Sequence, residues 1–195
     1  MASGKFGDWM APAADAAWRA ANRASVELGH SWLGTEHLLL GLLAGPPEDP
    51  AAAALTASGV TAAAVRTALT RDLSAGGGRE DRALLATLGV DLDAVHARVD
   101  AAFGPDAIDA LYARRRRAGR RLARGPLCGL GLAPRAKQAL GHARRAAKAD
   151  HRPRFDSTDL LLGVLAIDDG MAVRLLRDLG VDPAAVRARL PVRAA

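Results

Sequence analysis

Two stretches of the chain repeat one another, and this internal repeat constrains the fold more than any other feature of the sequence. Residues 28–43 read LGHSWLGTEHLLLGLL, and residues 154–165 read RFDSTDLLLGVL. A second similar pair follows in the same order, with ALTASGVTAAAVRTAL at 54–69 and LLRDLGVDPAAVRARL at 175–190. We therefore expect two copies of one unit, at residues 10–73 and 130–190, with an insert at 74–129 between them.

Each copy is expected to form four helices. The leucines of the LLLG element recur at helical spacing, and Ser, Thr and acidic residues suited to a helix N-terminus precede them. Gly59 and Gly180 are expected to end the third helices, and Thr61 and Asp182 to begin the fourth. No alternation of Val, Ile and Thr predicts a strand. Because four short helices bury little apolar surface alone, the expected fold is all-α, with both repeats packed as one bundle.

The insert carries a partial third copy, LLATLGVDLDAVHARV at 84–99, and then a predicted helix over 107–124. The chain has a net charge of +6, but residues 113–154 alone contain 14 Arg or Lys residues and one acid. Such a basic segment fits an acidic protein face, nucleic acid or a solvated helix face. We favour a protein-docking patch, with a nucleic-acid-associated regulator as the alternative. The patch comprises Arg114, Arg115, Arg116, Arg117, Arg120 and Arg121.

Several classes of protein are disfavoured by what the sequence lacks. Cys128 is the only cysteine, which excludes an intramolecular disulfide framework and a multi-cysteine zinc site. No apolar run approaches the ~20 residues of a membrane-spanning helix, and no secretory signal is visible. No catalytic motif appears, and Cys128 has no paired His and Asp signature, so a catalytic thiol is a minor alternative. We expect a cytoplasmic protein that is not an enzyme and needs no cofactor.

The segment LGHSWLGTEHLLLGLL, followed by GV-x4-VR, resembles the repeat of the Clp N-terminal domain. That domain heads the ClpC and ClpA unfoldases of the AAA+ Clp protease system. APRAKQAL at 133–140 is similar to the start of the family's second repeat. The resemblance implies a pseudo-twofold bundle that docks substrates and adaptors. Because the sequence has no GxxxxGK[ST] loop for a nucleotide phosphate, we expect a free-standing domain acting as adaptor, regulator or decoy for a ClpC-type unfoldase.

The resemblance also implies two kinds of binding site. Some ClpC proteins hold phosphoarginine tags with a carboxylate at the position of Glu36, where Thr35 could add a hydroxyl. In the second copy Thr158 aligns with Glu36 and Asp159 with His37, so the second carboxylate is shifted. The alternative is that these residues simply cap helices.

The second implied site is a groove between the two repeat starts, which in the family binds peptides, including cyclic peptide antibiotics. Ordinary terminal packing is the alternative. Trp18 and Trp32 are expected in the core. His30 and His37 flank the motif without further evident ligands, so no metal site is expected. The groove candidates are Phe6, Trp9, Met10, Leu132 and Lys137.

Overall fold

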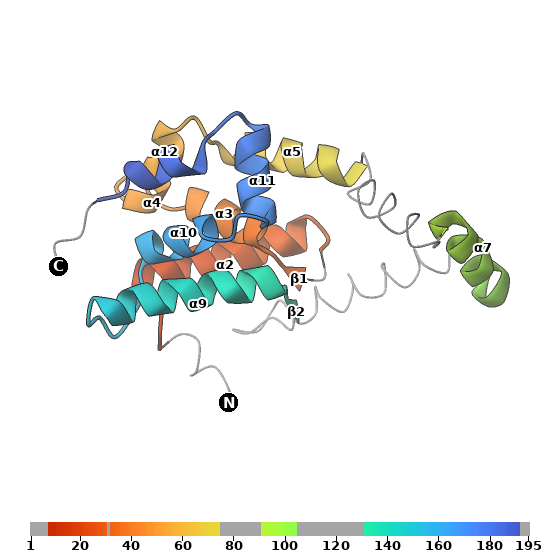
Figure 1. Cartoon of the computed structure of the whole chain (residues 1–195), viewed down its shortest axis with the longest axis horizontal. Helices are drawn as coiled ribbons and strands as arrows, with labels where there is room; N and C mark the ends of the chain where they lie inside the picture. The colour runs from red at the N-terminus through yellow and green to blue at the C-terminus, as the bar shows by residue number, and fades with distance from the viewer. Residues whose placement is uncertain (1–7, 31, 75–90, 105–130, 192–195) are drawn as a thin grey trace.

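The computed structural model describes residues 8–30, 32–74, 91–104 and 131–191. It is mainly helical, and the same order of helices occurs twice (Figure 1). The first repeat comprises α2 (Pro12–Glu27), α3 (Thr35–Leu43), α4 (Pro50–Ala57) and α5 (Ala62–Ser74). The second comprises α9 (Pro134–Ala149), α10 (Ser157–Leu165), α11 (Met171–Asp178) and α12 (Pro183–Ala188). The expected four helices per copy are thus present.

Two short backbone contacts join the repeats, and exchanging the repeats converts one contact into the other. Strand β1 (Trp32–Leu33) pairs in parallel with β2 (Gly131–Leu132), and an isolated bridge joins Met10 to Phe155. In the sequence alignment, Met10 corresponds to Leu132 and Leu33 to Phe155. This reciprocity is what an approximate twofold axis between the repeats produces. The expectation of no strands is therefore wrong in detail, because two-residue strands are too short to show an alternating pattern.

Within each repeat, a glycine allows the first two helices to approach closely. A Cβ atom on Gly41 would lie 2.2 Å from the carbonyl oxygen of Ala17, and one on Gly163 would lie 2.2 Å from that of Ala139. Backbone atoms cannot move aside as side chains can, so both crossings require the absence of a side chain. The glycine of the LLLG element is thus a packing residue in both copies.

A single apolar core extends through both repeats, and hydrogen bonds cross between them within it. The hydroxyl of Thr35, at the start of α3, accepts a bond of 3.1 Å from the backbone N–H of Ala172 in α11. Ser157, at the equivalent position of α10, donates a bond of 2.6 Å to Asp49, the N-cap of α4. Each repeat therefore satisfies polar groups at a helix N-terminus of the other.

The fourth helices begin and the third helices end as predicted. Asp182 accepts a hydrogen bond of 2.9 Å from the backbone N–H of Ala184, and Thr61 accepts one of 3.1 Å from that of Ala64. Gly59 and Gly180 adopt φ values of +80° and +73°, a conformation that favours glycine after a helix.

The insert contributes one described helix, α7 (Leu92–Phe103), which Figure 1 places away from the bundle. The other predicted parts of the insert, residues 84–90 and the helix over 107–124, lie outside the described residues. Trp18 is partly buried against the core, but the placement of Trp32 in the core was wrong, because 42 % of it is exposed. Successive strand residues point to opposite faces, and Leu33 takes the inward position.

In the described part of the chain, no single helix is both long and apolar enough to cross a membrane. Helices α4 and α5 meet the length and composition criteria only as a pair, bent by 68° at their junction.

Candidate functional site

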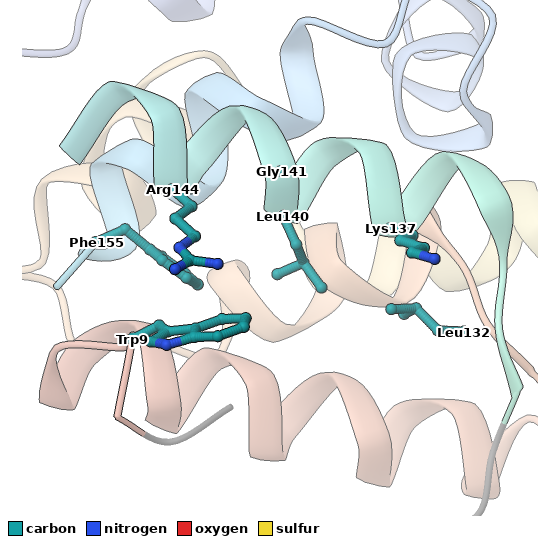
Figure 2. Close-up of a pocket in the computed structure, with 7 residues that line it drawn as sticks. All are labelled: Trp9, Leu132, Lys137, Leu140, Gly141, Arg144 and Phe155. Carbon is teal, nitrogen blue, oxygen red and sulfur yellow. The ribbon is translucent and has the colours of Figure 1, made fainter. Parts of the chain in front are cut away.

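A pocket of about 180 Å³ lies along α9, where the starts of both repeats meet (Figure 2). A cavity of about 150 Å³ is enough to hold a benzene ring, so this pocket can accept one large apolar side chain. Its apolar surface comes from Trp9, Leu132, Leu140 and Phe155, and its lining is completed by Lys137, Gly141 and Arg144.

Helical periodicity explains why α9 supplies four of these residues. Positions 137, 140, 141 and 144 recur at spacings of three and four, which places them on one face of the helix. Gly141 lies in the middle of this face, where a Cβ atom would meet only the end of the Arg145 side chain, at 3.4 Å. The absence of a side chain at Gly141 therefore keeps the centre of the pocket open.

The indole ring of Trp9 forms the wall of the pocket opposite α9, and the guanidinium group of Arg144 lies over this ring. The guanidinium carbon of Arg144 lies 3.8 Å from the centroid of the Trp9 ring, which is a close cation–π contact (Figure 2). Lys137 lies at the opposite end of the pocket, beside Leu132. The pocket is therefore apolar in its centre and has a positive charge at each end.

Three of the five residues predicted for the groove line this pocket: Trp9, Leu132 and Lys137. Met10 does not line it, because it is 4 % exposed and packs in the core. Phe6 lies outside the described residues. Sequence reasoning did not select Leu140, Gly141, Arg144 or Phe155. The helical spacing from Lys137 could have indicated the first three, whereas no local pattern in the sequence indicates Phe155.

The residues predicted to hold phosphoarginine lie at two equivalent helix N-termini, and they are buried. Thr35 and Thr158 are each almost fully covered, and Glu36 is 6 % exposed. The Glu36 carboxylate occupies the recess that Gly34 leaves, since a Cβ atom on Gly34 would lie 2.2 Å from Oε1 of Glu36. The structure therefore accounts for these side chains as parts of helix N-termini.

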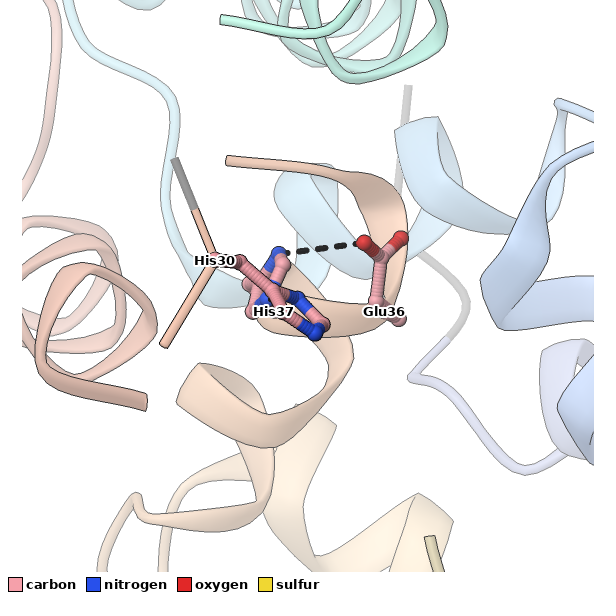
Figure 3. A group of neighbouring side chains, drawn as sticks. All are labelled: His30, Glu36 and His37. Carbon is pink, nitrogen blue, oxygen red and sulfur yellow. Dashed lines mark hydrogen bonds and ion pairs between the residues drawn. The ribbon is translucent and has the colours of Figure 1, made fainter. Parts of the chain in front are cut away.

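The Glu36 carboxylate belongs to a cluster with His30 and His37 (Figure 3). Nδ1 of His37 lies 3.1 Å from Oε1 of Glu36 and 2.9 Å from the backbone nitrogen of Gly34. Nε2 of His37 lies 2.8 Å from Nδ1 of His30. When Nδ1 of His37 is unprotonated it accepts from Gly34, and when protonated it can pair with Glu36 instead.

Burial and neighbouring charge shift two pKa values in this cluster. Burial, together with the nearby His37, lowers the pKa of His30, against a smaller opposing effect of Glu36. Burial by itself raises the pKa of Glu36, but its interactions with His37, with the backbone N–H of Glu36 and with His30 together outweigh that effect, and the net pKa is lowered.

The expectation that no further ligand lies near the two histidines was wrong. Glu36 supplies a third ligand atom, and the three atoms lie within 4.8 Å of one another. Imidazole and carboxylate groups are common zinc ligands. Both nitrogens of His37 already have partners, however, so the cluster is complete as a hydrogen-bonded unit, and a cation would have to replace the contact between the two histidines.

At the equivalent place in the second repeat, an arginine and an aspartate replace the two histidines. Arg152 corresponds to His30, and Asp159 corresponds to His37. Arg152 donates two hydrogen bonds to the carboxylate of Asp159, at 2.7 and 2.8 Å. Asp159 also accepts from the backbone N–H of Asp156 at 2.9 Å, as His37 does from Gly34. The carboxylates of Asp159, Asp150 and Asp156 hold the pKa of Arg152 above its usual value.

The remaining candidates, Cys128 and the arginine patch at 114–121, lie outside the described residues.

A pseudo-twofold pair of helical repeats with a pocket at their junction is the architecture of a helical interaction domain. A model of the Clp repeat N-terminal domain matches residues 10–82 and 132–193. The N-terminal domain of the caseinolytic protease associated chaperone ClpD from Arabidopsis thaliana has a similar fold, with a TM-score of 0.55. The two sequences are 17 % identical, over 95 % of this chain and 96 % of that one. A comparison with curated proteins found no match.

The chain belongs to the Clp repeat N-terminal domain family. The domain that defines this family is a non-catalytic protein-interaction module of the Clp system.

Proposed function

We propose that this protein binds peptide segments of Clp-system partners in the pocket at the repeat junction, and that it acts as an adaptor, regulator or decoy for a ClpC-type unfoldase. The observation that carries the proposal is the apolar pocket formed by Trp9, Leu132, Leu140 and Phe155. Its walls come from the starts of both repeats. Apolar concave surfaces with a few polar groups are the usual form of a ligand site.

Binding of this kind requires no nucleotide. The 195 residues contain no GxxxxGK[ST] loop, so docking is passive, and any unfolding would be powered by the partner. Occupation of the pocket has one of two consequences. In delivery, the bound substrate reaches the unfoldase in a ternary complex, whereas a decoy holds the same ligand and keeps it away.

Two measurements test the proposal. A fluorescein-labelled cyclic peptide that targets Clp N-domains is expected to bind the purified protein, and binding is expected to be lost in Gly141→Leu, which fills the pocket. The control is Gln138→Leu, which adds the same side chain to α9 at an exposed position outside the pocket. Equal binding by both variants would place the ligand elsewhere.

Delivery and sequestration are then separated by size-exclusion chromatography of protein, peptide and a purified ClpC-type unfoldase. Co-elution of all three supports delivery. A peptide complex that elutes apart from the unfoldase supports a decoy.

Phosphoarginine binding at Thr35, Glu36, Thr158 and Asp159 is a separate proposal, supported by the resemblance to ClpC proteins. Titration with free phosphoarginine tests it, with Glu36→Gln as the variant, because the amide keeps the shape of the side chain and removes its charge. Weaker binding at an unchanged melting temperature would support a ligand role. A lower melting temperature with unchanged binding would support the capping role.

A further inference from the structure

We infer that the pocket along α9 selects acidic peptides: a large apolar side chain enters the pocket, and carboxylates on either side of it pair with Lys137 and Arg144. This inference rests on the proposed function, because it names the class of peptide that the same pocket takes.

The first observation is the charge of the helix that forms the pocket. Helix α9 carries five basic residues and no acidic residue along its 16 positions. Two of the five, Lys137 and Arg144, line the pocket, and both are exposed. Among the described residues, neither has a carboxylate within salt-bridge distance, whereas Arg135 on the same helix pairs with Asp169. Within the described part of the chain, the charges of the two pocket cations are therefore available for a ligand.

The second observation is the geometry of Arg144. Its guanidinium group lies over the Trp9 ring, with 3.8 Å between the guanidinium carbon and the ring centroid. An arginine held in this way is oriented in advance, while the N–H groups at its edge stay able to bind a carboxylate with two hydrogen bonds. A ligand carboxylate at this end would thus meet a positioned donor.

The third observation is the spacing of the two cations. Lys137 and Arg144 are seven positions apart, which corresponds to about 10 Å along an α-helix. An extended peptide rises about 3.3 Å per residue, so this span matches three residues. The best ligand therefore carries two acids three positions apart, with the apolar residue between them, as in Glu-Phe-Ala-Glu.

The opposite side of the repeat junction lacks these features. The positions of α2 equivalent to Lys137, Gly141 and Arg144 are Asp15, Arg19 and Asn22. Asp15 and Arg19 pair with each other, and Asn22 donates a hydrogen bond to the backbone of Trp18. The combination of an open centre and two cations is thus specific to α9.

The experiment compares three labelled peptides by fluorescence polarisation at low salt: one containing Glu-Phe-Ala-Glu, its neutral form Gln-Phe-Ala-Gln, and Glu-Ala-Ala-Glu without the aromatic ring. We expect the first to bind about five-fold or more tightly than the second, and this advantage to shrink as salt is added. The third is expected not to bind measurably.

Variants connect this preference to the two cations. Lys137→Gln combined with Arg144→Gln is expected to lower the affinity for the acidic peptide to that for the neutral one. Lys148→Gln, which removes a cation from the same helix outside the pocket, is expected to preserve the preference. Gly141→Leu is expected to abolish binding of both peptides.

The outcomes separate the two proposals. Equal affinity for the acidic and neutral peptides would overturn the charge preference and leave peptide binding intact. A preference that survives loss of both cations would also overturn it, as would one equally weakened by Lys148→Gln. If no peptide binds, including the cyclic peptide, the proposed function itself fails.

Discussion

The two repeats share a backbone plan but place different side chains on it, and the difference determines where a ligand can bind. On α9, Gly141 leaves space in front of Leu140 and Phe155. On α2, the equivalent residue is Arg19, which is held by Asp15. One copy of the duplicated unit thus has an open apolar surface, while the other carries an ion pair at the corresponding place. The packing of the bundle is symmetric, and the chemistry of its surface is not.

A second contrast lies at the N-termini of α3 and α10. In both repeats the third helical residue accepts a hydrogen bond from the backbone N–H of the N-cap residue. In the first repeat that residue is His37, held by His30, and in the second it is Asp159, held by Arg152. The same capping role is therefore filled by a pair of imidazoles in the first repeat and by an arginine–carboxylate ion pair in the second.

The largest loss of stability is expected for substitutions at the close helix crossing that the two repeats share. Gly163→Ala would place a methyl group 2.2 Å from a carbonyl oxygen of α9, and Gly41→Ala would do the same against α2. We expect each change to lower the free energy of unfolding by about 3 kcal/mol, because a backbone clash relaxes poorly. Urea denaturation measures this.

The matched control is Gly141→Ala, which has open space and should gain up to about 1 kcal/mol from helix propensity. If only one of the two buried glycines proves sensitive, the helix crossings in the two repeats are not equivalent.

A smaller effect is expected where the repeats differ. Arg152→Ala removes the positive partner of Asp159, whose carboxylate is 1 % exposed, and leaves a buried charge. We expect a loss of about 2 kcal/mol, less than for a fully buried pair because Arg152 is partly exposed. His30→Ala at the equivalent position should cost about 1 kcal/mol, since it removes one hydrogen bond without exposing a charge.

Chemical denaturation of both variants tests this order, and the double variant Arg152→Ala/Asp159→Asn should recover part of the loss. Equal losses for Arg152→Ala and His30→Ala would show that the ion pair adds nothing beyond the hydrogen bond it replaces.

The sequence was most informative where the repeat specified packing. The LLLG element, the glycines after the third helices and the cap residues Thr61 and Asp182 each depend on local geometry, and local geometry is encoded by nearby residues. The presence of two copies also supported the helix assignment in each, because a pattern found twice in the same order is rarely accidental.

The site was only partly predictable, because it depends on which side chains meet across the repeats. Trp9 and Arg144 are 135 positions apart, and no local pattern brings them together. Met10 and Trp9 are both apolar residues at a repeat start, but Met10 packs in the core and only Trp9 lines the pocket. The sequence offers Glu36 as a ligand or a cap, whereas its proximity to His30 depends on the fold of the loop before α3.

The smallest expected effect is a dependence of stability on pH, and it arises in the first repeat alone. Because the pKa of His30 is lowered in the folded protein, the unfolded chain binds the proton more readily, and stability is lost as pH falls below about 6.5. Above that value the contribution is fully present. Melting temperatures measured between pH 7.5 and 5.5 should therefore fall toward the acidic end, before the carboxylates titrate.

In His30→Gln this dependence should flatten, because the amide does not titrate. Arg152→Ala should keep it, since the lowered pKa of His30 arises at the other helix N-terminus. A slope that is unchanged in His30→Gln but lost in Arg152→Ala would place the pH-sensitive element in the second repeat, and the assignment of the pH dependence to His30 would then be wrong.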